Sequence, residues 1–437
     1  MVRTIISDLI KWKNSINRKP LIIRGARQTG KSWVVEHFGK QHYPGKVHII
    51  NFEKRPDLHL VFESNFDIKR ICFELEILLE VSFDPQKDLI FFDEIQACPK
   101  ALMSLRYFYE DHREYHLIAA GSLIDFALKE VPFPVGRVMQ MEMYPLTFYE
   151  FLLANGKQNL ADLISNIQIN ISESVDLVLQ DQLSKYFIVG GMPECVKIFV
   201  ESNNLQRVTQ IQDDLLYALR EDYKKYTPTV SADCLNDILN KVSSGVGNQI
   251  KYRKLSDRFS GPTIKKGFDL LKTARLVYQV QNVSVAGLPL TSGGIQFKAL
   301  FLDIGLLVRL SGLRIKEELV QGTLLSSYKG MLAEQFVGQE IIATHKDGLF
   351  YWMNTTSGTS SEVDYIIERS GQIIPIEVKF GKSGSLKSLH VLMEKYSHIK
   401  QAVVISGSRI GIEKNITFIP LYRVQSVFSD NLSIAPL

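Results

Sequence analysis

Short, mostly apolar runs alternate with amphipathic stretches along the first 150 residues of the chain. Runs of this length are typical of strands that are buried on both faces of a sheet. The stretches between them have apolar residues at helical spacing, as at Val34, Val35 and Phe38. Strands that alternate with helices form a parallel sheet, with its site at the carboxyl ends of the strands. The pattern therefore predicts an α/β domain over residues 1–150. The predicted strands are Leu21–Arg24, Val47–Phe52, Leu89–Phe92, His116–Ser122 and Arg137–Met143.

The first run leads directly into a glycine-bracketed loop, GARQTGKS, which fits the pattern GxxxxGK followed by Ser or Thr. The backbone N–H groups of a phosphate-binding loop surround phosphate oxygens, and glycine permits the turns that this requires. The N-terminus of the following helix attracts the same anion. We therefore expect Lys31 to reach the β- and γ-phosphates and Ser32 to be a ligand of Mg²⁺. The residues predicted to contact the nucleotide are Gly25, Ala26, Arg27, Gln28, Thr29, Gly30, Lys31, Ser32 and Trp33.

An acidic pair, Asp93 and Glu94, follows the predicted strand Leu89–Phe92. In a parallel sheet this pair belongs to the same carboxyl edge as the loop. Asp93 is predicted to hold Mg²⁺ through water, and Glu94 is predicted to polarise the attacking water. A pair that orients water favours hydrolysis over phosphotransfer to another substrate.

Two further residues near this edge are catalytic candidates, and each has a simpler interpretation. Ser122, at the end of its predicted strand, could sense the γ-phosphate, or it could be a capping serine. Arg137 could neutralise charge in the transition state, in its own subunit or in a neighbour, or it could be a solvated surface residue.

The middle of the chain changes from an α/β pattern to a largely helical one. Residues 151–228 are predicted to form a helical lid that closes over the nucleotide. Within residues 229–290, three predicted helices, the second of them short, precede two strand-like stretches, which suggests a winged helix. The predicted third helix begins near Pro262, where proline is tolerated.

A basic cluster lies on the predicted winged helix and could contact the phosphates of DNA. The alternative is a winged helix that packs on protein and has an ordinary solvated face, because no set of Arg, Asn and Gln residues for reading base edges stands out. The residues of this basic cluster are Arg253, Lys254, Arg258, Lys265 and Lys266.

Four charged residues towards the C-terminus form a second candidate site. Glu334 lies in a predicted amphipathic helix, Asp364 lies in a strand, and Glu377 and Lys379 lie two residues apart in the next strand, so that both project to one face. The neighbours of this last pair are strongly apolar, and charges are costly there unless they are paired. This combination resembles the core of PD-(D/E)xK nucleases, which implies a restriction-endonuclease-like α/β domain over residues 291–437.

The nuclease resemblance implies that Glu334, Asp364 and Glu377 hold one or two Mg²⁺ ions, and that Lys379 steadies or deprotonates the attacking water. Two alternatives remain open. One is a half-buried sheet whose charges face solvent, and the other is a nuclease fold that only binds nucleic acid.

Five sequence segments resemble, in this order, a widespread prokaryotic family in which an AAA-type ATPase module is fused to a C-terminal domain of unknown function. They are GARQTGKS, FFDEIQACP, AAGSLIDF, VGRVMQMEMYPLTFYEFL and YFIVGGMPECV. The resemblance covers nearly the whole chain. It implies a P-loop NTPase fold of the AAA type and ATP as the nucleotide, and it assigns a sensor position to Ser122. The chain departs from the family at Gln28, where these proteins often carry a second Arg.

Composition narrows the class of protein further. The chain has 437 residues, of which 45% are hydrophobic and 22% are charged, as is typical of globular proteins with several domains. A formal charge of +4 is too small to indicate nucleic-acid binding by itself. The four cysteines are widely spaced, which favours a reduced compartment and no structural zinc. The amphipathic start and the absence of a long apolar run predict a cytoplasmic protein without membrane contact.

The sequence thus leaves two functional hypotheses. In the first, a Mg²⁺-dependent ATPase couples its nucleotide state to a winged helix and a nuclease-like domain that act on DNA. In the second, the chain is a regulatory or signalling ATPase whose C-terminal domains bind protein or nucleic acid without cleavage. An oligomer is compatible with either hypothesis, because AAA-type modules often form rings.

Overall fold

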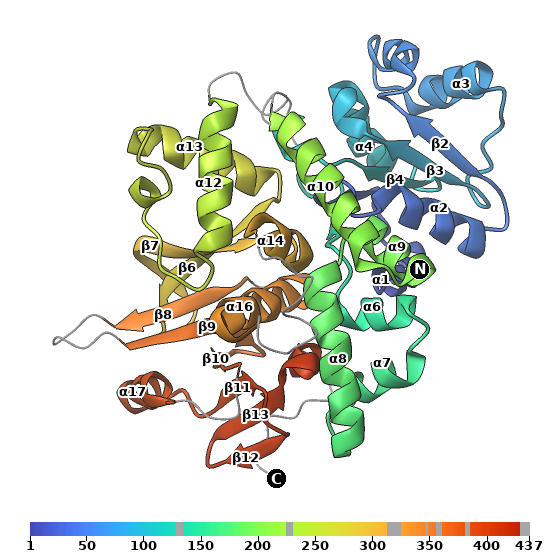
Figure 1. The fold of residues 1–437 in the computed structure, drawn as a ribbon. Coiled ribbons are helices and arrows are strands. Elements are labelled where there is room, and N and C mark those ends of the chain that lie inside the picture. The colour runs from blue at the N-terminus through green and yellow to red at the C-terminus, as the bar shows by residue number, and fades with distance from the viewer. Residues whose placement is uncertain are drawn as a thin grey trace. The chain divides into compact units, whose positions relative to one another are not determined.

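The chain forms two compact units in the computed structural model (Figure 1). The structure describes residues 1–127, 134–223, 230–312, 325–345, 348–354, 361–380 and 385–428. We call Val2–Tyr144 with Thr273–Arg275 the N-terminal unit, and Pro145–Lys272 with Leu276–Leu437 the C-terminal unit. Within the described residues, no helix is both long enough and apolar enough to cross a lipid bilayer.

The N-terminal unit is built on a five-stranded parallel sheet with the strand order β2-β3-β4-β1-β5. The predicted α/β domain with five parallel strands is therefore confirmed. Its strands are β1 (Leu21–Arg24), β2 (Val47–Asn51), β3 (Leu89–Asp93), β4 (His116–Ala120) and β5 (Met139–Glu142). Its helices are α1 (Ile5–Lys13), α2 (Lys31–His42), η1 (Pro56–Phe62), α3 (Ile68–Leu79), η2 (Ile95–Ala97), α4 (Pro99–Asp111) and α5 (Ile124–Ala127).

Both faces of this sheet are covered by helices, which explains the continuous apolar runs. On β3, Leu89 and Phe91 belong to the core formed with α1 and α2, whereas Ile90 and Phe92 belong to the core formed with α3 and α4. Successive side chains of a strand point to opposite faces, so a strand between two helical layers needs apolar residues at every position.

The C-terminal unit combines helices with a mixed sheet of eight strands in the order β12-β13-β11-β10-β9-β8-β6-β7. Its strands are β6 (Val277–Ser284), β7 (Thr291–Phe301), β8 (Phe350–Asn354), β9 (Ser361–Arg369), β10 (Gln372–Val378), β11 (Ala402–Ser406), β12 (Gly411–Glu413) and β13 (Ile416–Pro420). Its helices are α6 (Phe148–Ala154), α7 (Gln158–Ser165), α8 (Glu173–Val189), α9 (Pro193–Ser202), α10 (Leu205–Glu221), α12 (Ala232–Ser244), η3 (Tyr252–Lys254), α13 (Gly261–Thr273), α14 (Ile304–Leu310), α16 (Leu325–Thr344), α17 (Lys387–Lys395) and η5 (Leu421–Phe428).

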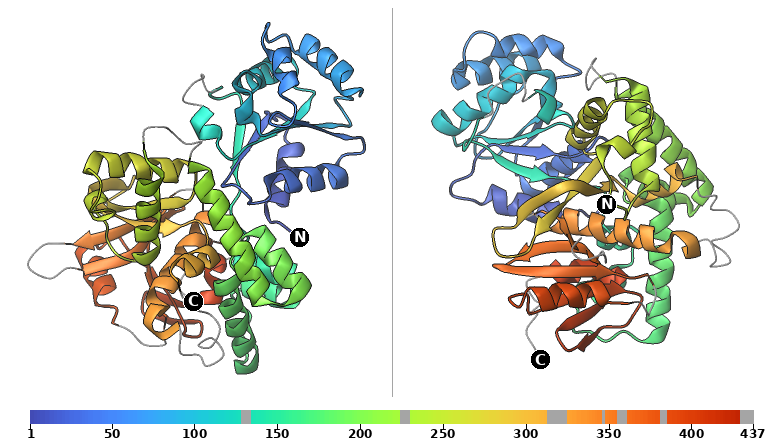
Figure 2. Two further views of the ribbon diagram at one scale, coloured as in Figure 1. Left: turned by 45° about the horizontal axis from the view of Figure 1, so that its top comes forward. Right: turned by 90° about the vertical axis from the view of Figure 1, so that its left-hand side faces the viewer.

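The two faces of β9 meet different surroundings. Val363 belongs to a core cluster with Leu389 and Leu392 of α17. The neighbouring Glu362 and Asp364 point to the opposite face, where α16 supplies Glu334. Figure 2 shows both helices beside the sheet, α16 in light orange and α17 in red-brown. The charged residues of the second candidate site are thus separated from the apolar core by the sheet itself.

The region predicted as a winged helix differs from that prediction in two details. The predicted second helix is wrong, because Tyr252–Lys254 forms only a short 3₁₀ turn. In the stretch around this turn only Leu255 is buried, so the segment lacks the apolar face that a helix needs in order to pack. The two strand-like stretches do form a hairpin, β6–β7, but β6 also pairs with β8. The hairpin is therefore one edge of the eight-stranded sheet.

The segments PLTFYEFL and GGMPE, on which much of the family resemblance depends, meet inside the C-terminal unit. The Leu146 N–H donates to the Gly191 carbonyl oxygen at 2.6 Å, and the Gly191 N–H donates to Asp303 at 2.6 Å. Gly190 has a positive φ of 73°, and a Cβ there would clash with the Asp303 carboxylate. Burial raises the pKa of Asp303 to about 6. These segments therefore organise the core of the unit.

Candidate functional site

The predicted phosphate loop connects β1 to α2 in the N-terminal unit. Gly30 has a φ of 90° and precedes the first residue of α2, so its conformation favours glycine. A Cβ on Gly25 would collide with the carbonyl oxygen of Met143, so the loop also needs glycine at this position. Gly30, the N-cap residue of α2, makes no side-chain capping hydrogen bond. The N–H groups at the start of a helix attract anions, as a phosphate site requires.

Lys31 is folded back onto the loop that it terminates. It is buried, and its Nζ donates to the carbonyl oxygens of Ala26 at 2.8 Å and Gly25 at 3.0 Å. Burial lowers the pKa of Lys31 to about 8, although the charges of Glu94 and Asp93 oppose this shift. The ammonium therefore lies close to both acidic residues, held by carbonyl groups that a phosphate oxygen can replace.

Ser32 and Asp93 join the two motifs. The Ser32 Oγ donates to Asp93 Oδ1 at 2.9 Å, and Asn51 Nδ2 donates to Asp93 Oδ2 at 3.0 Å. The structure thus places the acidic residue of β3 beside the start of α2. A hydroxyl and a carboxylate are hard oxygen donors of the kind that Mg²⁺ prefers, so this pair fits the metal. Asn51 ends β2 directly beside Asp93 in the sheet, and its position at the carboxyl edge was the sequence signal available for it.

Glu94 is held in an unusual backbone conformation, with a φ of 49°. A non-glycine residue in this region is strained, and such strain is often found at functional sites. Glu94 Oε2 accepts a hydrogen bond from Gln96 Nε2 at 2.5 Å. Gln96 in turn lies against Gly121, where a Cβ would meet its amide oxygen. The sequence gives no signal for this role of Gln96 beyond its place two residues after the acidic pair.

The remaining candidates of the N-terminal unit lie in different environments. Ser122 is buried and accepts a hydrogen bond from Arg27 Nε at 3.4 Å, which connects it to the loop. Arg137 is half-exposed and forms an ion pair with Glu110 of α4 at 2.6 Å. Trp33 is 44% exposed and stacks on His37, one turn further along α2. Ser122 therefore belongs to the loop region, whereas Arg137 and Trp33 make surface contacts.

Gln28 and Thr29 complete the loop. Gln28 has a φ of 61°. Thr29 is fully buried, and its hydroxyl donates to the Ala26 carbonyl oxygen at 2.9 Å, which closes the turn. The Arg3 side chain also donates to the Thr29 carbonyl oxygen at 3.1 Å. Side chains therefore hold the loop in the shape that its glycines permit.

In the C-terminal unit, β9 and β10 form the predicted hairpin with its turn at Ser370 and Gly371. The Val378 N–H donates to Asp364 Oδ2 at 2.8 Å, which fixes this carboxylate against β10. Lys379 Nζ donates to Glu377 Oε1 at 2.6 Å, so these two residues form a pair on one face.

Lys298 of β7, which the sequence analysis did not identify, lies among the acidic residues. Its Nζ is 3.2 Å from Glu334 Oε2, 3.3 Å from Asp364 Oδ1 and 2.5 Å from Glu362 Oε1. The side chain is 2% exposed. The structure therefore brings Glu334 and Asp364 together, but it does so around an ammonium group.

Two of the acidic groups have strongly perturbed titration. Burial raises the pKa of Glu377 to about 7, and the negative charge of Asp364 acts in the same direction. Burial likewise raises the pKa of Glu334 to about 7, again reinforced by Asp364. Glu377 Oε2 is buried and has no hydrogen-bond partner.

This second cluster does not fit a divalent metal as it is arranged. In the described part of the chain, no three or more His, Cys, Asp or Glu residues are grouped so that they could hold an ion. Lys298 already lies between Glu334 and Asp364, and Glu377 is paired with Lys379. The predicted metal role of Glu334, Asp364 and Glu377 is thus at odds with the geometry.

The basic cluster is largely accessible. Lys265 and Lys266 are exposed on α13, and Arg253 and Lys254 are exposed near η3. Arg258 is also exposed, but its Nε donates to Asp237 at 2.9 Å. Four of these cations therefore face solvent, and the fifth is bound to an acidic residue of α12.

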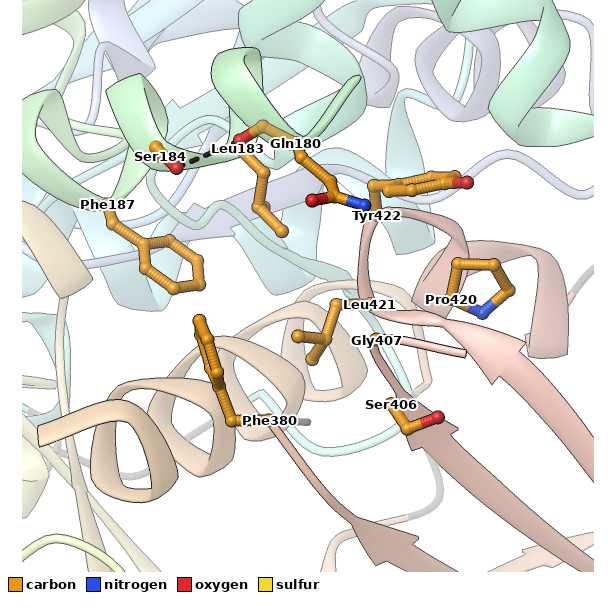
Figure 3. Close-up of a pocket in the computed structure, with 10 residues that line it drawn as sticks. All are labelled: Gln180, Leu183, Ser184, Phe187, Phe380, Ser406, Gly407, Pro420, Leu421 and Tyr422. Carbon is orange, nitrogen blue, oxygen red and sulfur yellow. Dashed lines mark hydrogen bonds between the residues drawn. The ribbon is translucent and has the colours of Figure 1, made fainter. Parts of the chain in front are cut away.

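A cavity of about 250 Å³ lies elsewhere in the C-terminal unit, between α8 and the ends of β11 and β13 (Figure 3). Leu183, Phe187, Phe380 and Leu421 give it an apolar wall. Figure 3 shows the side chains of Phe187 and Phe380 next to one another, pointing from opposite elements toward each other. Among the described residues that line this cavity, none is charged and none belongs to the predicted sites.

Three segments of the chain match known protein families. Residues 17–152 match AAA_14, described as an AAA domain. Residues 180–317 match a domain of unknown function, DUF8612, and residues 329–424 match another, DUF4143. The chain therefore carries an AAA domain followed by two domains without a described function. This confirms the predicted fusion of an AAA-type module to a domain of unknown function.

Individual relatives are distant. The uncharacterized protein MJ1544 of Methanocaldococcus jannaschii is 24% identical over 277 residues, which are 62% of this chain. The chain spans 58% of the length of that relative. The Walker-type ATPase PABY2304 of Pyrococcus abyssi has a TM-score of 0.46 and 14% identity, over 71% of this chain and 96% of that chain. The ORC1 protein of Aeropyrum pernix, solved in complex with DNA, has a TM-score of 0.29 and 12% identity, over 73% and 92% of the two chains. Likenesses at these levels identify no ligand of this chain.

Proposed function

We propose that this chain binds ATP together with Mg²⁺ in the loop between Gly25 and Ser32 and hydrolyses it. The observation that carries the proposal is the hydrogen bond from Ser32 Oγ to Asp93 Oδ1, at 2.9 Å. It joins the glycine loop and the acidic pair, which are 61 residues apart in the chain. The AAA domain matched by residues 17–152 supports the same activity.

The residues of the loop perform the binding step. Lys31 exchanges the carbonyl oxygens of Gly25 and Ala26 for phosphate oxygens, and the N–H groups at the start of α2 donate to the same phosphates. The full charge of Lys31 is favoured once a phosphate replaces neutral carbonyl groups. Ser32 and Asp93 are the residues that would hold Mg²⁺, which neutralises phosphate charge when bound.

The acidic pair and its neighbours perform the hydrolytic step. Glu94 orients the attacking water and accepts its proton. Gln96 holds the Glu94 carboxylate until the substrate is bound, because their hydrogen bond occupies Oε2. Ser122 senses the γ-phosphate in this proposal, which its hydrogen bond with Arg27 of the loop supports. Arg137 is a weaker candidate for charge stabilisation, because Glu110 already neutralises it.

The test compares the wild type with Lys31→Ala and Glu94→Gln, using a fluorescent ATP analogue for binding and phosphate release for turnover. Lys31→Ala is expected to lose both binding and turnover. Glu94→Gln is expected to bind the nucleotide and to hydrolyse it slowly. Wild-type turnover in Glu94→Gln would show that Glu94 does not take part in hydrolysis. Normal nucleotide affinity in Lys31→Ala would show that the loop does not bind the nucleotide.

For the C-terminal unit we propose a nuclease-like core. The order α16, β8, β9, β10, α17 and β11, with β10 and β11 parallel, gives one helix, three antiparallel strands, a second helix and a fourth strand. This order supports the predicted resemblance to PD-(D/E)xK proteins. This core and the exposed cations of the basic cluster together favour DNA as the partner. We propose that the nucleotide bound in the N-terminal unit controls how the chain acts on DNA.

The geometry favours a C-terminal unit that binds DNA without cleaving it, because Lys298 neutralises the acidic residues that would hold a metal. The test is to incubate the protein with ATP, Mg²⁺ or Mn²⁺, and single- or double-stranded DNA. DNA retention without cut ends supports binding without cleavage. Cleavage that is lost in Glu377→Ala would instead establish a nuclease.

A further inference from the structure

Lys298 is a buried cation in a place where the predicted function required a metal ion. It comes from β7, inside the apolar stretch FKALF, and its side chain is 2% exposed. Removing an ammonium group from water is costly unless charged or polar partners surround it. The structure supplies those partners, and they offset the cost of burying the Lys298 ammonium group at this position.

The partners come from one helix and one strand of the C-terminal unit. Glu334 projects from α16, and Glu362 and Asp364 project from alternate positions of β9. The carboxylate oxygens lie at 2.5 to 3.3 Å from Nζ. The ring of Tyr351 on β8 also lies 5.7 Å from Nζ, which adds a favourable contact for a cation.

Other groups hold these carboxylates in place. The second oxygen of Asp364 accepts the Val378 N–H, and the second oxygen of Glu362 accepts a hydrogen bond from the Gln249 side chain. The Tyr365 hydroxyl donates to the backbone carbonyl of Glu334 at 2.7 Å. The cluster is therefore built around the ammonium from several sides.

We propose that the ammonium of Lys298 takes the place of a divalent metal ion in this cluster, and that the C-terminal unit of this protein works without a metal there. A divalent ion binds carboxylate oxygens at about 2.0–2.6 Å and would need the space that Nζ occupies. Its two positive charges would also repel the ammonium. The lysine is thus an internal counter-ion that excludes a metal.

Glu377, the fourth acidic residue, is accounted for in the same way. Lys379 Nζ contacts its Oε1 at 2.6 Å, so a second lysine neutralises this carboxylate. Cleavage of a phosphodiester by metal-activated water needs an open metal site. The cluster offers none, which agrees with a nuclease-like core that binds but does not cut. This inference does not depend on ATP hydrolysis in the N-terminal unit.

The experiment measures Mn²⁺ binding to the full chain by electron paramagnetic resonance and thermal unfolding, without nucleotide. All proteins carry Asp93→Asn, so that the N-terminal site does not contribute. Four variants are compared on this background: no further change, Lys298→Met, Asp364→Asn, and Lys185→Met as a control that removes an exposed lysine paired with Asp181.

With no further change, and with Lys185→Met, the protein is expected to bind no Mn²⁺ at millimolar concentration and to show no change in Tm. Lys298→Met is expected to have a lower Tm without metal, and Mn²⁺ should bind to it and raise the Tm. Mn²⁺ binding that is present in the background protein and lost with Asp364→Asn would overturn the proposal. A folded Lys298→Met protein that neither binds Mn²⁺ nor changes its Tm when Mn²⁺ is added would also overturn the proposal. If Lys298→Met does not fold, the background protein and Asp364→Asn still decide the question.

Discussion

The two candidate sites of this chain use acidic residues in opposite ways. In the N-terminal unit, Asp93 is held by a hydroxyl and an amide, both uncharged, so its negative charge is not neutralised by these contacts. In the C-terminal unit, Glu334 and Asp364 meet around the ammonium of Lys298. In the first arrangement the nearby Lys31 ammonium donates to carbonyl groups and the carboxylate accepts from neutral groups, whereas in the second the carboxylates surround a lysine ammonium directly. Acidic residues at motif spacing therefore do not by themselves indicate a metal site.

A third carboxylate, Glu340 of α16, is fully buried and is held by uncharged groups among the described residues. It accepts hydrogen bonds from the Phe148 N–H at 3.0 Å and from Gln425 Nε2 at 2.7 Å. Burial raises its pKa to about 8. Burial thus favours the protonated, uncharged form of this carboxyl group, so a proton takes the role that a cation has at the other two carboxylates.

The largest expected effect concerns the first site. Glu94→Gln should lower ATP turnover by about 10²–10⁴-fold, because the amide orients water but cannot accept its proton. Nucleotide affinity should change little, since the loop and Lys31 are intact. Steady-state phosphate release and nucleotide titration measure the two quantities. Glu114→Gln, at an exposed residue beside His112, is the matched control and should behave like the wild type.

Replacing the internal cation should affect stability rather than ATP hydrolysis. Lys298→Met is expected to lower the free energy of unfolding by about 3–5 kcal/mol, because it leaves buried charges without a partner. Lys379→Met should cost clearly less, because the Lys379 side chain is 30% exposed and Glu377 can take up a proton. Urea denaturation followed by tryptophan fluorescence and circular dichroism compares the two. Equal costs for both variants would contradict the distinction between a fully buried lysine and a partly exposed one.

Glu340 should make stability depend on pH. Its pKa in the folded state, about 8, lies above the ordinary value of 4.5 expected in the unfolded chain. The neutral form is therefore favoured by folding. This contribution is fully present below pH 4.5 and is lost as the pH rises through 8. In Glu340→Gln the decrease in Tm between pH 5 and pH 9 should be smaller than in the wild type, by an amount that corresponds to roughly 1–3 kcal/mol. The same decrease in both proteins would remove Glu340 from the account.

The smallest expected effect refines the description of the first site. Asn51→Ala removes the amide that donates to Asp93 Oδ2. Such a hydrogen bond to a charged group contributes about 1.5 kcal/mol, which corresponds to roughly a tenfold higher Mg²⁺ concentration for half-maximal ATP turnover. A Mg²⁺ titration of the ATPase measures this value. An unchanged titration would show that Asn51 holds the strand and not the acidic residue.

The sequence was sufficient for the N-terminal unit because each of its elements is encoded locally. Apolar runs specify buried strands, and the glycines of the loop specify its turns. The β9–β10 hairpin was also predictable, because Ser370 and Gly371 interrupt two apolar stretches.

Partners that are distant in the chain could not be predicted in this way. Lys298 lies in an apolar run 36 residues before Glu334 and 66 before Asp364, and no local pattern connects them. The contact of Gly191 with Asp303 likewise depends on packing across 112 residues. The predicted second helix of the winged-helix region was wrong because Leu255 is the only buried residue of positions 251–260, which is too little apolar surface to hold a helix in place.

The most direct test of the central contrast is anomalous diffraction from crystals grown with Mn²⁺ and a non-hydrolysable ATP analogue. The account predicts one manganese peak beside Ser32 and Asp93 and no peak among Glu334, Asp364 and Glu377. A manganese peak in the second cluster, with the Lys298 ammonium displaced, would contradict it.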